Sequence, residues 1–179
     1  MKLLILTTLA LIAIAYAGPS ISDNFVTWTV VTVKSQDEFI QLTEHIYEDS
    51  DDKKQRIDTW IEGTQMTFLT TDGNRYNIRN NGQNCTVQKG YPVLPWFDWL
   101  SDATEGDACR VNGVDGTSWH FEVRDVRLQL CFSDDLSVPL DMYIDQHKEQ
   151  RLTHVTFEFF NGVKPDPKAF DVPKICTSQ

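Results

Sequence analysis

Apolar and polar side chains alternate with a period of two through much of the second half of the chain. Trp119, Phe121 and Val123 are separated by His120 and Glu122, and three later segments repeat the pattern, namely 126–132, 138–144 and 155–159. Successive side chains of a strand point to opposite faces of a sheet. The alternation therefore predicts an antiparallel sheet with one apolar and one solvated face.

The first half of the chain also predicts strands separated by turns. These strands are rich in β-branched and aromatic residues or flank turn signals, and they cover 25–33, 44–48, 55–61, 64–71 and 75–80. Asp72-Gly73-Asn74 is typical of a tight turn, and the acidic run 49–52 predicts a hairpin loop. Ser35 and Glu38 form a capping-box pattern, which leaves open a helix within 36–47.

The segment 95–100 departs from the alternation. Pro95 stands at a suitable first helical position, and Trp96, Trp99 and Leu100 follow with i, i+3, i+4 spacing. This spacing predicts a short amphipathic helix with both tryptophans on one side. A sheet with one apolar face has to cover that face. We therefore expect the sheet either to curl on itself or to leave a concave apolar surface.

The N-terminal residues 1–17 have the pattern of an export signal. Lys2 supplies a positive charge, an apolar run follows, and Ala15-Tyr16-Ala17 places small residues where a signal peptidase reads them. We expect cleavage after Ala17 and a single secreted, extracellular domain over 18–179, with no transmembrane segment. The net charge of −10 argues against nucleic-acid binding, because phosphates require Lys and Arg.

Four cysteines follow the signal, and an even number in a secreted chain predicts two disulfides. Three pairings are possible, and we predict Cys85–Cys109 and Cys131–Cys176. The first would close a loop around the expected helix, and the second would tie the tail to a strand. Asn84 opens the sequon Asn84-Cys85-Thr86, so it is a candidate glycosylation site that should lie on the surface.

Motifs of catalysis are missing from the sequence. It has no GxSxG, no HExxH and no phosphate-binding glycine loop, and its histidines lack ligand-like spacing. The acidic run 48–52 lacks the glycine and the distal glutamate of an EF-hand, which favours a solvated loop over a cation site. We therefore expect a non-enzymatic protein with no cofactor and no metal ion.

Aromatic residues give the best indication of a binding site. We expect one hollow lined by Trp96, Trp99, Leu100, Trp119, Phe121, Val155, Phe157 and Phe159. In this hypothesis Trp96 and Trp99 form a lid, and Val155, Phe157 and Phe159 form the floor. Core packing is the alternative interpretation, because aromatic side chains dominate any hydrophobic core.

Several blocks of the sequence resemble a group of small secreted proteins. The blocks are PWFDWLSDATEGDACRVNG, TSWHFEV, LCFSDDLSVPL, TFEFFNGVKPDPKAFDVPKIC and EHIYEDSDDKKQRID. The group includes a development-specific protein of sea-urchin embryos and the non-catalytic N-terminal region of insect cysteine proteinases. More distantly, the chain is similar to the ependymin-related proteins. Protease activity is not implied.

The resemblance to ependymin-related proteins implies a fold like that of bacterial lipoprotein carriers. In such a fold a mostly β, strongly bent antiparallel sheet forms a half-barrel with one or two short helices on its concave side. The hollow of such a half-barrel accepts acyl chains or other hydrophobic ligands.

Residues and resemblance together favour a secreted glycoprotein that binds a hydrophobic small molecule or lipid on the concave face of a bent sheet. The alternative is an extracellular protein-interaction module, such as a prodomain-like inhibitor or matrix component, with a self-filled hollow. Its partner would be another extracellular protein. Arg75 and Arg79 lie opposite Tyr76 and Ile78 on their strand, and we expect these arginines to point away from the hollow.

Overall fold

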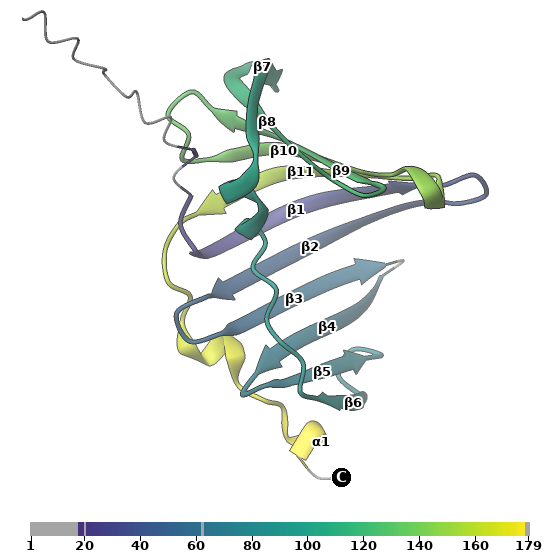
Figure 1. Cartoon of the computed structure of the whole chain (residues 1–179). Coiled ribbons are helices and arrows are strands. Elements are labelled where there is room, and N and C mark those ends of the chain that lie inside the picture. The colour runs from purple at the N-terminus through teal and green to yellow at the C-terminus, as the bar shows by residue number, and fades with distance from the viewer. Residues whose placement is uncertain (1–17, 20, 62, 178–179) are drawn as a thin grey trace, which may run out of the picture.

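Strands dominate the computed structural model, which describes residues 18–19, 21–61 and 63–177 (Figure 1). The predicted export signal, 1–17, lies outside the described residues. Within them, eleven strands form one antiparallel sheet: β1 (Asn24–Lys34), β2 (Phe39–Asp49), β3 (Lys54–Ile61), β4 (Thr64–Thr71), β5 (Asn74–Arg79), β6 (Asn84–Lys89), β7 (Thr104–Val111), β8 (Val114–Val123), β9 (Val126–Ser133), β10 (Pro139–Gln146) and β11 (Arg151–Asn161). The helices are short: η1 (Asp98–Asp102), η2 (His147–Glu149), η3 (Pro167–Phe170) and α1 (Lys174–Thr177).

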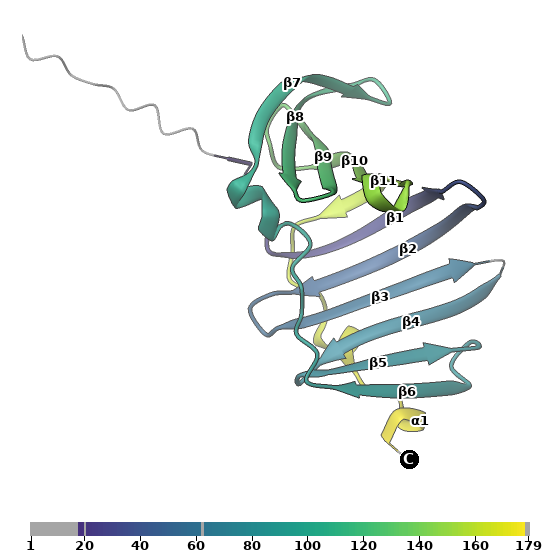
Figure 2. The same ribbon diagram turned by 45° about the vertical axis from the view of Figure 1, so that its right-hand side comes forward.

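The strand order places the two halves of the chain on either side of β1. It runs β6-β5-β4-β3-β2-β1-β11-β10-β9-β8-β7. The sheet bends so that β7 and β8 arch over one face, as Figure 2 shows. Because β6 and β7 are separate edges, the sheet is not closed into a barrel. The predicted class, a mostly β fold with a bent antiparallel sheet, is confirmed.

Local turn chemistry agrees with most of the predicted hairpins. Asp72 and Gly73 have positive φ angles of 52° and 70° at the β4–β5 turn, which suits the right-handed twist of paired strands. The helix considered within 36–47 is wrong, because β2 begins at Phe39. The Ser35 N–H donates to the Glu38 carbonyl at 2.9 Å and closes the β1–β2 turn instead of capping a helix.

Residues 90–103, called the strap, connect the two edge strands across one face of the sheet (Figures 1 and 2). We call the face that the strap crosses the concave face. The helix predicted at 95–100 is wrong in type and position: η1 is a 3₁₀ helix that starts at Asp98, with Phe97 at its N-cap. An extended chain advances about 3.3 Å per residue and a helix only about 1.5 Å, so the extended form lets a short connection span a wide sheet.

The main core lies between the strap and the concave face. Its buried members come from both halves of the sheet and from the strap, and they are Phe25, Val31, Ile46, Phe97, Leu100, Trp119, Leu130, Phe132, Met142 and Val155. The opposite, convex face is covered over β3–β6 by the C-terminal segment 163–177. There the Arg56 guanidinium donates to the Ala169 carbonyl at 2.9 Å, and Phe170 is buried.

Two intrachain disulfides form, as predicted, but both predicted pairings are wrong. The structure joins Cys85 to Cys176 and Cys109 to Cys131. Cys85 lies on β6 and Cys109 on β7, which are opposite edges of the sheet, so the pairing of sequence neighbours is sterically impossible. The Cys109–Cys131 bridge instead passes over β8 at Gly116, where an added Cβ would lie only 1.8 Å from the Phe132 carbonyl oxygen.

Removal of the two disulfides should cost different amounts of stability. Cys85 and Cys176 are 91 residues apart in sequence, whereas Cys109 and Cys131 are 22 residues apart. Loop-closure entropy grows with loop length, so paired Cys→Ser changes at Cys85 and Cys176 should destabilise the protein by about 1 kcal/mol more than paired changes at Cys109 and Cys131. Urea unfolding of both variants measures the difference. Equal losses would contradict the entropic account.

Candidate functional site

The strap is held by one buried carboxylate on the concave face. Glu48 is only 1% exposed, and it accepts hydrogen bonds from the Trp96 N–H at 3.3 Å and from the Gln55 amide at 2.9 Å. The same Gln55 amide donates to the Leu94 carbonyl at 3.2 Å. Burial raises the pKa of Glu48, and these donors oppose the rise. β2 and β3 thereby fix the entry of the strap onto the sheet.

Phe97 anchors the centre of the strap. Its ring lies 5.3 Å from the ring of Phe25 and 6.3 Å from the rings of Phe157 and Phe160. Val155 is also buried in this core. The predicted floor residues Val155 and Phe157 therefore lie on the concave face, where they contribute to packing beneath the strap.

An apolar cavity of about 280 Å³ opens beside the strap. Its lining comes from the strap and from β9 and β10, and consists of Leu94, Trp96, Trp99, Leu128, Met142 and Ile144. The Trp99 indole N–H donates to the Trp96 carbonyl at 3.1 Å, and the Trp99 ring packs 6.2 Å from that of Phe121. Both predicted lid residues thus lie over the apolar face of the sheet.

A larger cavity, of about 850 Å³, lies between η1, β7 and the N-terminal residues Gly18, Pro19, Ile21 and Asp23. Leu100 and Trp119 contribute to its wall, together with Asp23, Asp98 and Glu105. Since acidic side chains share the lining, this cavity suits a hydrophobic ligand less well than the cavity beside Trp96 and Trp99.

Phe159 does not belong to the floor. Thr29 pairs with Phe157 while Trp28 pairs with Phe159, so Glu158 is the extra residue of a β-bulge. One extra residue turns the following side chains to the other face. Phe159 consequently lies on the convex face, 41% exposed, with its ring 5.2 Å from that of Trp28.

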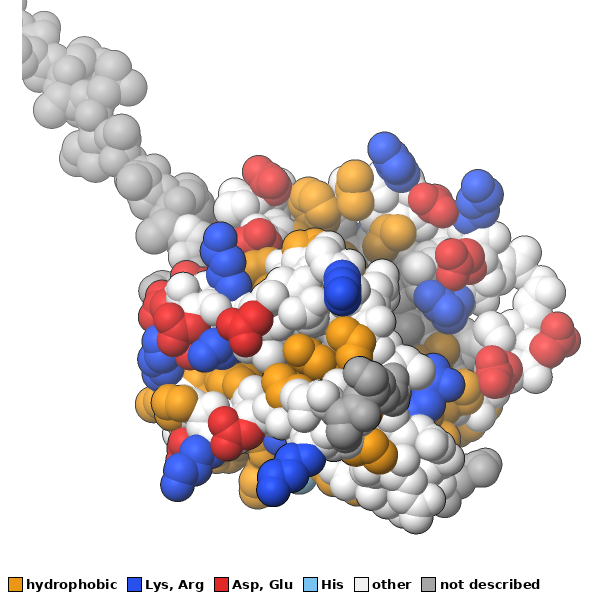
Figure 3. All heavy atoms as spheres, turned by 90° about the horizontal axis from the view of Figure 1, so that it is seen from below, with side chains coloured by type: hydrophobic (Ala, Val, Ile, Leu, Met, Phe, Trp, Pro, Cys, Tyr) orange, Lys and Arg blue, Asp and Glu red, His pale blue; other side chains and the backbone are white. Residues whose placement is uncertain are grey.

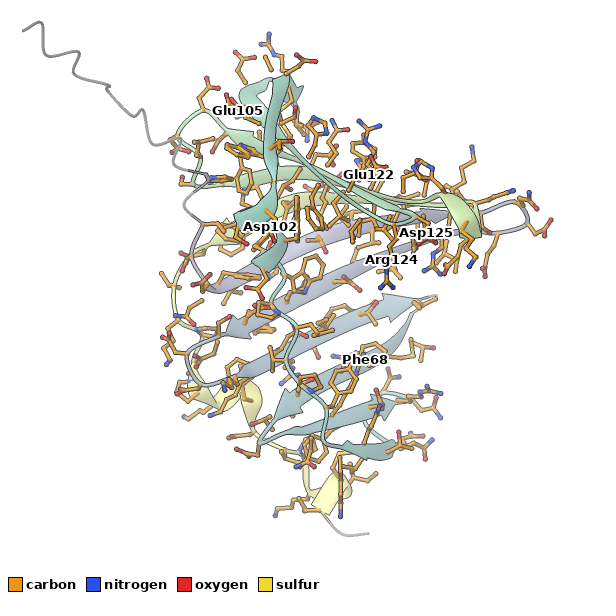
Figure 4. All side chains as sticks on the ribbon, viewed as in Figure 1. Phe68, Asp102, Glu105, Glu122, Arg124 and Asp125 are labelled. Carbon is orange, nitrogen blue, oxygen red and sulfur yellow. A yellow bond between two sulfur atoms is a disulfide. The ribbon has the colours of Figure 1, made fainter. Side chains whose placement is uncertain are left out.

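The arginine prediction on β5 is also wrong. Arg75 pairs with Thr70, and its guanidinium stacks 4.9 Å from the Phe68 ring and 4.7 Å from the Tyr91 ring. Figure 4 shows Phe68 on the same side of the sheet as the strap. Arg75 therefore lies on the concave face, as does Arg79 four residues later. Tyr76 and Ile78 instead lie on the convex face, which the C-terminal segment covers.

Four residues of the cavity were not predicted from the sequence: Leu94, Leu128, Met142 and Ile144. The alternation at 126–132 and 138–144 placed Leu128, Met142 and Ile144 on an apolar face. It could not predict which residues of that face the strap leaves uncovered. The bulge between Pro139 and Asp141 also shifts the register beside this cavity.

A polar row interrupts the concave floor. Glu44 of β2 pairs in register with Thr29 of β1 on one side and with Thr59 of β3 on the other. Thr29 and Thr59 are 2% and 3% exposed, and their hydroxyl oxygens have no hydrogen-bond partner among the described residues. Burial raises the pKa of Glu44 from its ordinary 4.5 to about 7. The sequence analysis missed this row, because its members are ordinary polar residues on separate strands.

Two histidines lie within hydrogen-bond distance of polar side chains. On the convex face, His154 Nε2 lies 2.5 Å from the Asp141 carboxylate, and the Thr156 hydroxyl donates to the same carboxylate rather than to the histidine. On β8, the Ser118 hydroxyl lies 3.0 Å from His120 Nε2 but is buried and donates to the Asp107 carbonyl. Neither arrangement presents an exposed hydroxyl activated by a base.

Lysine neutralises the acidic β2–β3 loop. The Lys164 ammonium lies 3.2 Å from the Asp49 carboxylate and 3.0 Å from that of Asp52. Its hydrogen bond and its charge lower the pKa of Asp52. In the part of the chain that the structure describes, no group of three or more His, Cys, Asp or Glu side chains is arranged to hold a metal ion.

Surface features bear on the remaining predictions. Asn84 is exposed at the start of β6, as expected of a glycosylation site; its modification stays a prediction. Hydrophobic, acidic and basic side chains mingle on the face seen from the β6 edge (Figure 3). No helix within residues 18–19, 21–61 and 63–177 has the length and hydrophobicity needed to cross a membrane.

Comparison with known proteins identifies relatives of the fold. An uncharacterized conserved protein from Thermus thermophilus aligns over 83% of this chain and 86% of its own, with 14% identity and a TM-score of 0.56. The Pseudomonas aeruginosa MucA/MucB complex gives 18% identity and a TM-score of 0.51 over 86% of this chain, which spans only 58% of the matched chain. A putative outer membrane lipoprotein-sorting protein domain from Vibrio parahaemolyticus gives 9% identity, coverages of 83% and 89%, and a TM-score of 0.39.

At these identities the likeness is one of fold. No protein-family model and no curated protein matches the sequence. The bent open sheet therefore defines the class of protein, and function has to be argued from the site.

Glu44 should make stability depend on pH. Its folded pKa is raised, so the folded state binds more protons than the unfolded state between about 4.5 and 7, and stability falls as the pH rises through this window. The variant Glu44→Gln carries no charge. It should therefore be more stable than the wild type at pH 8, by on the order of 2 kcal/mol, and nearly equal to it at pH 4.

Urea unfolding across this pH range measures the effect. Glu122→Gln is the matched control, because Glu122 is exposed on β8 (Figure 4). A wild type and a Glu44→Gln variant with parallel pH profiles would show that Glu44 is solvated.

Proposed function

We propose that the protein is a secreted, non-enzymatic binding protein that holds a hydrophobic small molecule or lipid on the concave face of its sheet. The observation that carries the proposal is the cavity beside the strap, whose six lining side chains are all apolar. Apolar burial contributes roughly 25 cal/mol per Å², so such a surface favours a hydrophobic occupant over water.

The size of this cavity limits what it holds alone. Ligand pockets commonly enclose about 300–1,000 Å³, and the cavity of about 280 Å³ lies just below that range. One acyl chain or ring system would fill it, and the rest of the ligand would lie along the concave face. The cavity opens to solvent beside Leu94, and Trp96 and Trp99 form its wall on the strap side.

The fold supports the proposal in its coarse form. The chain shares its fold with the Thermus thermophilus protein and with MucB, at TM-scores of 0.56 and 0.51. The choice of a lipid, the secretion of the chain and the glycan at Asn84 are parts of the proposal, as is the likeness to ependymin-related proteins.

A protein-interaction module is the second candidate, and the convex face favours it. Trp28 is 47% exposed, and its ring stacks 5.0 Å from His45 and 5.2 Å from Phe159. Contiguous exposed aromatic groups are typical of interaction surfaces. The similar structure from Pseudomonas aeruginosa is that of a complex between MucB and MucA.

Replacement of one tryptophan on each face separates the two functions. Addition of a nonpolar dye or of dodecanol should shift the tryptophan emission of the wild type. Trp99→Ala should weaken that binding at least tenfold, because Trp99 forms a wall of the cavity. Trp28→Ala removes the same side chain from the convex face and should leave the affinity unchanged.

Isothermal titration calorimetry gives the affinities, and thermal unfolding checks that both variants are folded. Absence of binding by every lipid class tested would remove the carrier function and leave the interaction module. Equal losses in both variants would place the site elsewhere.

A further inference from the structure

The polar row on the concave floor calls for a partner that the chain does not provide. The Thr29 and Thr59 hydroxyls are buried without a hydrogen bond, and Glu44 between them makes no ion pair or hydrogen bond among the described residues. A buried polar group without a partner destabilises the folded state, because it has lost its hydrogen bonds to water. Such groups are rare in folded proteins and each needs an explanation. Here two of them, the Thr29 and Thr59 hydroxyls, flank the half-buried Glu44 on one face of adjacent strands.

Glu48 shows that the same strand can satisfy a buried carboxylate. Glu48 lies four residues further along β2 on the same face, and it accepts hydrogen bonds from Gln55, Ser50 and the Trp96 N–H. Glu44 is half-buried between two threonines, and burial alone accounts for its raised pKa. The difference between the two glutamates points to an external partner for Glu44.

The chemistry of the row selects the ligand head group. The row offers three acceptors, one carboxylate and two hydroxyl oxygens, in a line across three strands. A primary ammonium carries three N–H donors and a positive charge. Hydrogen bonds to charged groups are about twice as strong as neutral ones, so an ammonium gains more here than an alcohol or an amide.

We propose that Thr29, Glu44 and Thr59 bind the head group of a long-chain primary amine, whose alkyl chain extends toward the cavity beside Trp96 and Trp99. This inference rests on the proposed function and names the class of ligand. Met142, which lines the cavity, pairs with Val155 of β11, and Val155 pairs with Val31 of β1. Val31 pairs in turn with Leu42 of β2, and Glu44 lies two residues beyond Leu42 on the same face. Three strand spacings amount to about 14 Å, a distance that a dodecyl chain spans.

The surroundings of Glu44 leave room for this charge. Thr29 of β1 and Thr59 of β3 are uncharged, and the hydrogen-bonded Glu48 is the next titratable group on the same face of β2. Arg75 is occupied by Tyr91 and Phe68. Arg79 is exposed at the C-terminal end of β5. Arg124 is exposed at the β8–β9 turn and points toward the lower strands in Figure 4. Asp98 of the strap is exposed as well.

Binding of the amine should be linked to pH. The pKa of Glu44 is about 7 in the free protein, whereas an alkyl ammonium stays protonated well above pH 8. The ion pair needs an ionised Glu44, so affinity for the amine should rise between pH 5 and pH 8, and binding near pH 6 should release a proton. Affinity for an uncharged alcohol should not rise in this window.

Calorimetry with dodecylamine, dodecanol and dodecanoate, each below its micelle-forming concentration, tests the proposal on the whole secreted protein. At pH 8 we expect dodecylamine to bind at least tenfold more tightly than dodecanol, and dodecanoate to bind most weakly. Glu44→Gln should abolish this preference. Glu122→Gln removes an equal charge from an exposed site and should keep it, which separates the head-group site from general attraction to an acidic protein.

Thr29→Val and Thr59→Val give a readout that a merely structural role would not produce. Each removes an unpartnered hydroxyl, so each variant should unfold at a higher urea concentration than the wild type. Each should also bind dodecylamine several-fold more weakly while keeping its affinity for dodecanol. We therefore expect each variant to be more stable than the wild type and to bind dodecylamine more weakly.

The outcomes distinguish this inference from the proposed function. Binding of dodecanol with no preference for dodecylamine, or a preference that survives Glu44→Gln, overturns the head-group site and leaves the hydrophobic-ligand function standing. Absence of binding by all three amphiphiles overturns both.

Discussion

Packing of the strap against the concave face is the interaction on which the rest of the structure depends. A sheet of eleven strands with only short helices has little else to cover its apolar side. Phe97 inserts among Phe25, Phe157 and Phe160, which come from the two neighbouring central strands β1 and β11. Through this contact the strap, which connects the edge strands β6 and β7, also forms a second layer over the sheet.

The strap is narrower than the face that it covers, and the site follows from this mismatch. Where Phe97 and Leu100 reach the sheet the hollow is filled, as the interaction-module alternative expects. Beside Trp96 and Trp99 it is not, and an apolar cavity remains over β9 and β10. The two interpretations of the aromatic set, core and binding site, therefore apply to different members of that set.

Two carboxylates on β2, the buried Glu48 and the half-buried Glu44, illustrate how one face serves both structure and function. Glu48 has hydrogen-bond donors from β3, the β2–β3 turn and the strap, so its burial fixes the strap in place. Glu44 has none of these and keeps a raised pKa. A structural carboxylate is satisfied within the chain, and one left unsatisfied beside two buried hydroxyls is suited to a ligand.

Period-two alternation by itself determined that the chain forms an antiparallel sheet with one apolar face, because side-chain direction in a strand follows from local backbone geometry. Turn residues such as Asp72 and Gly73 likewise fixed a hairpin locally. Only the tertiary structure decided the disulfide pairing, the strap in place of a helix, and the faces of Phe159 and Arg75. Those features depend on strand order, on a bulge at Glu158 and on which strands become edges, and each is set by contacts between residues far apart in sequence. For the same reason the alignment of Thr29, Glu44 and Thr59 exists only once three strands have paired in register.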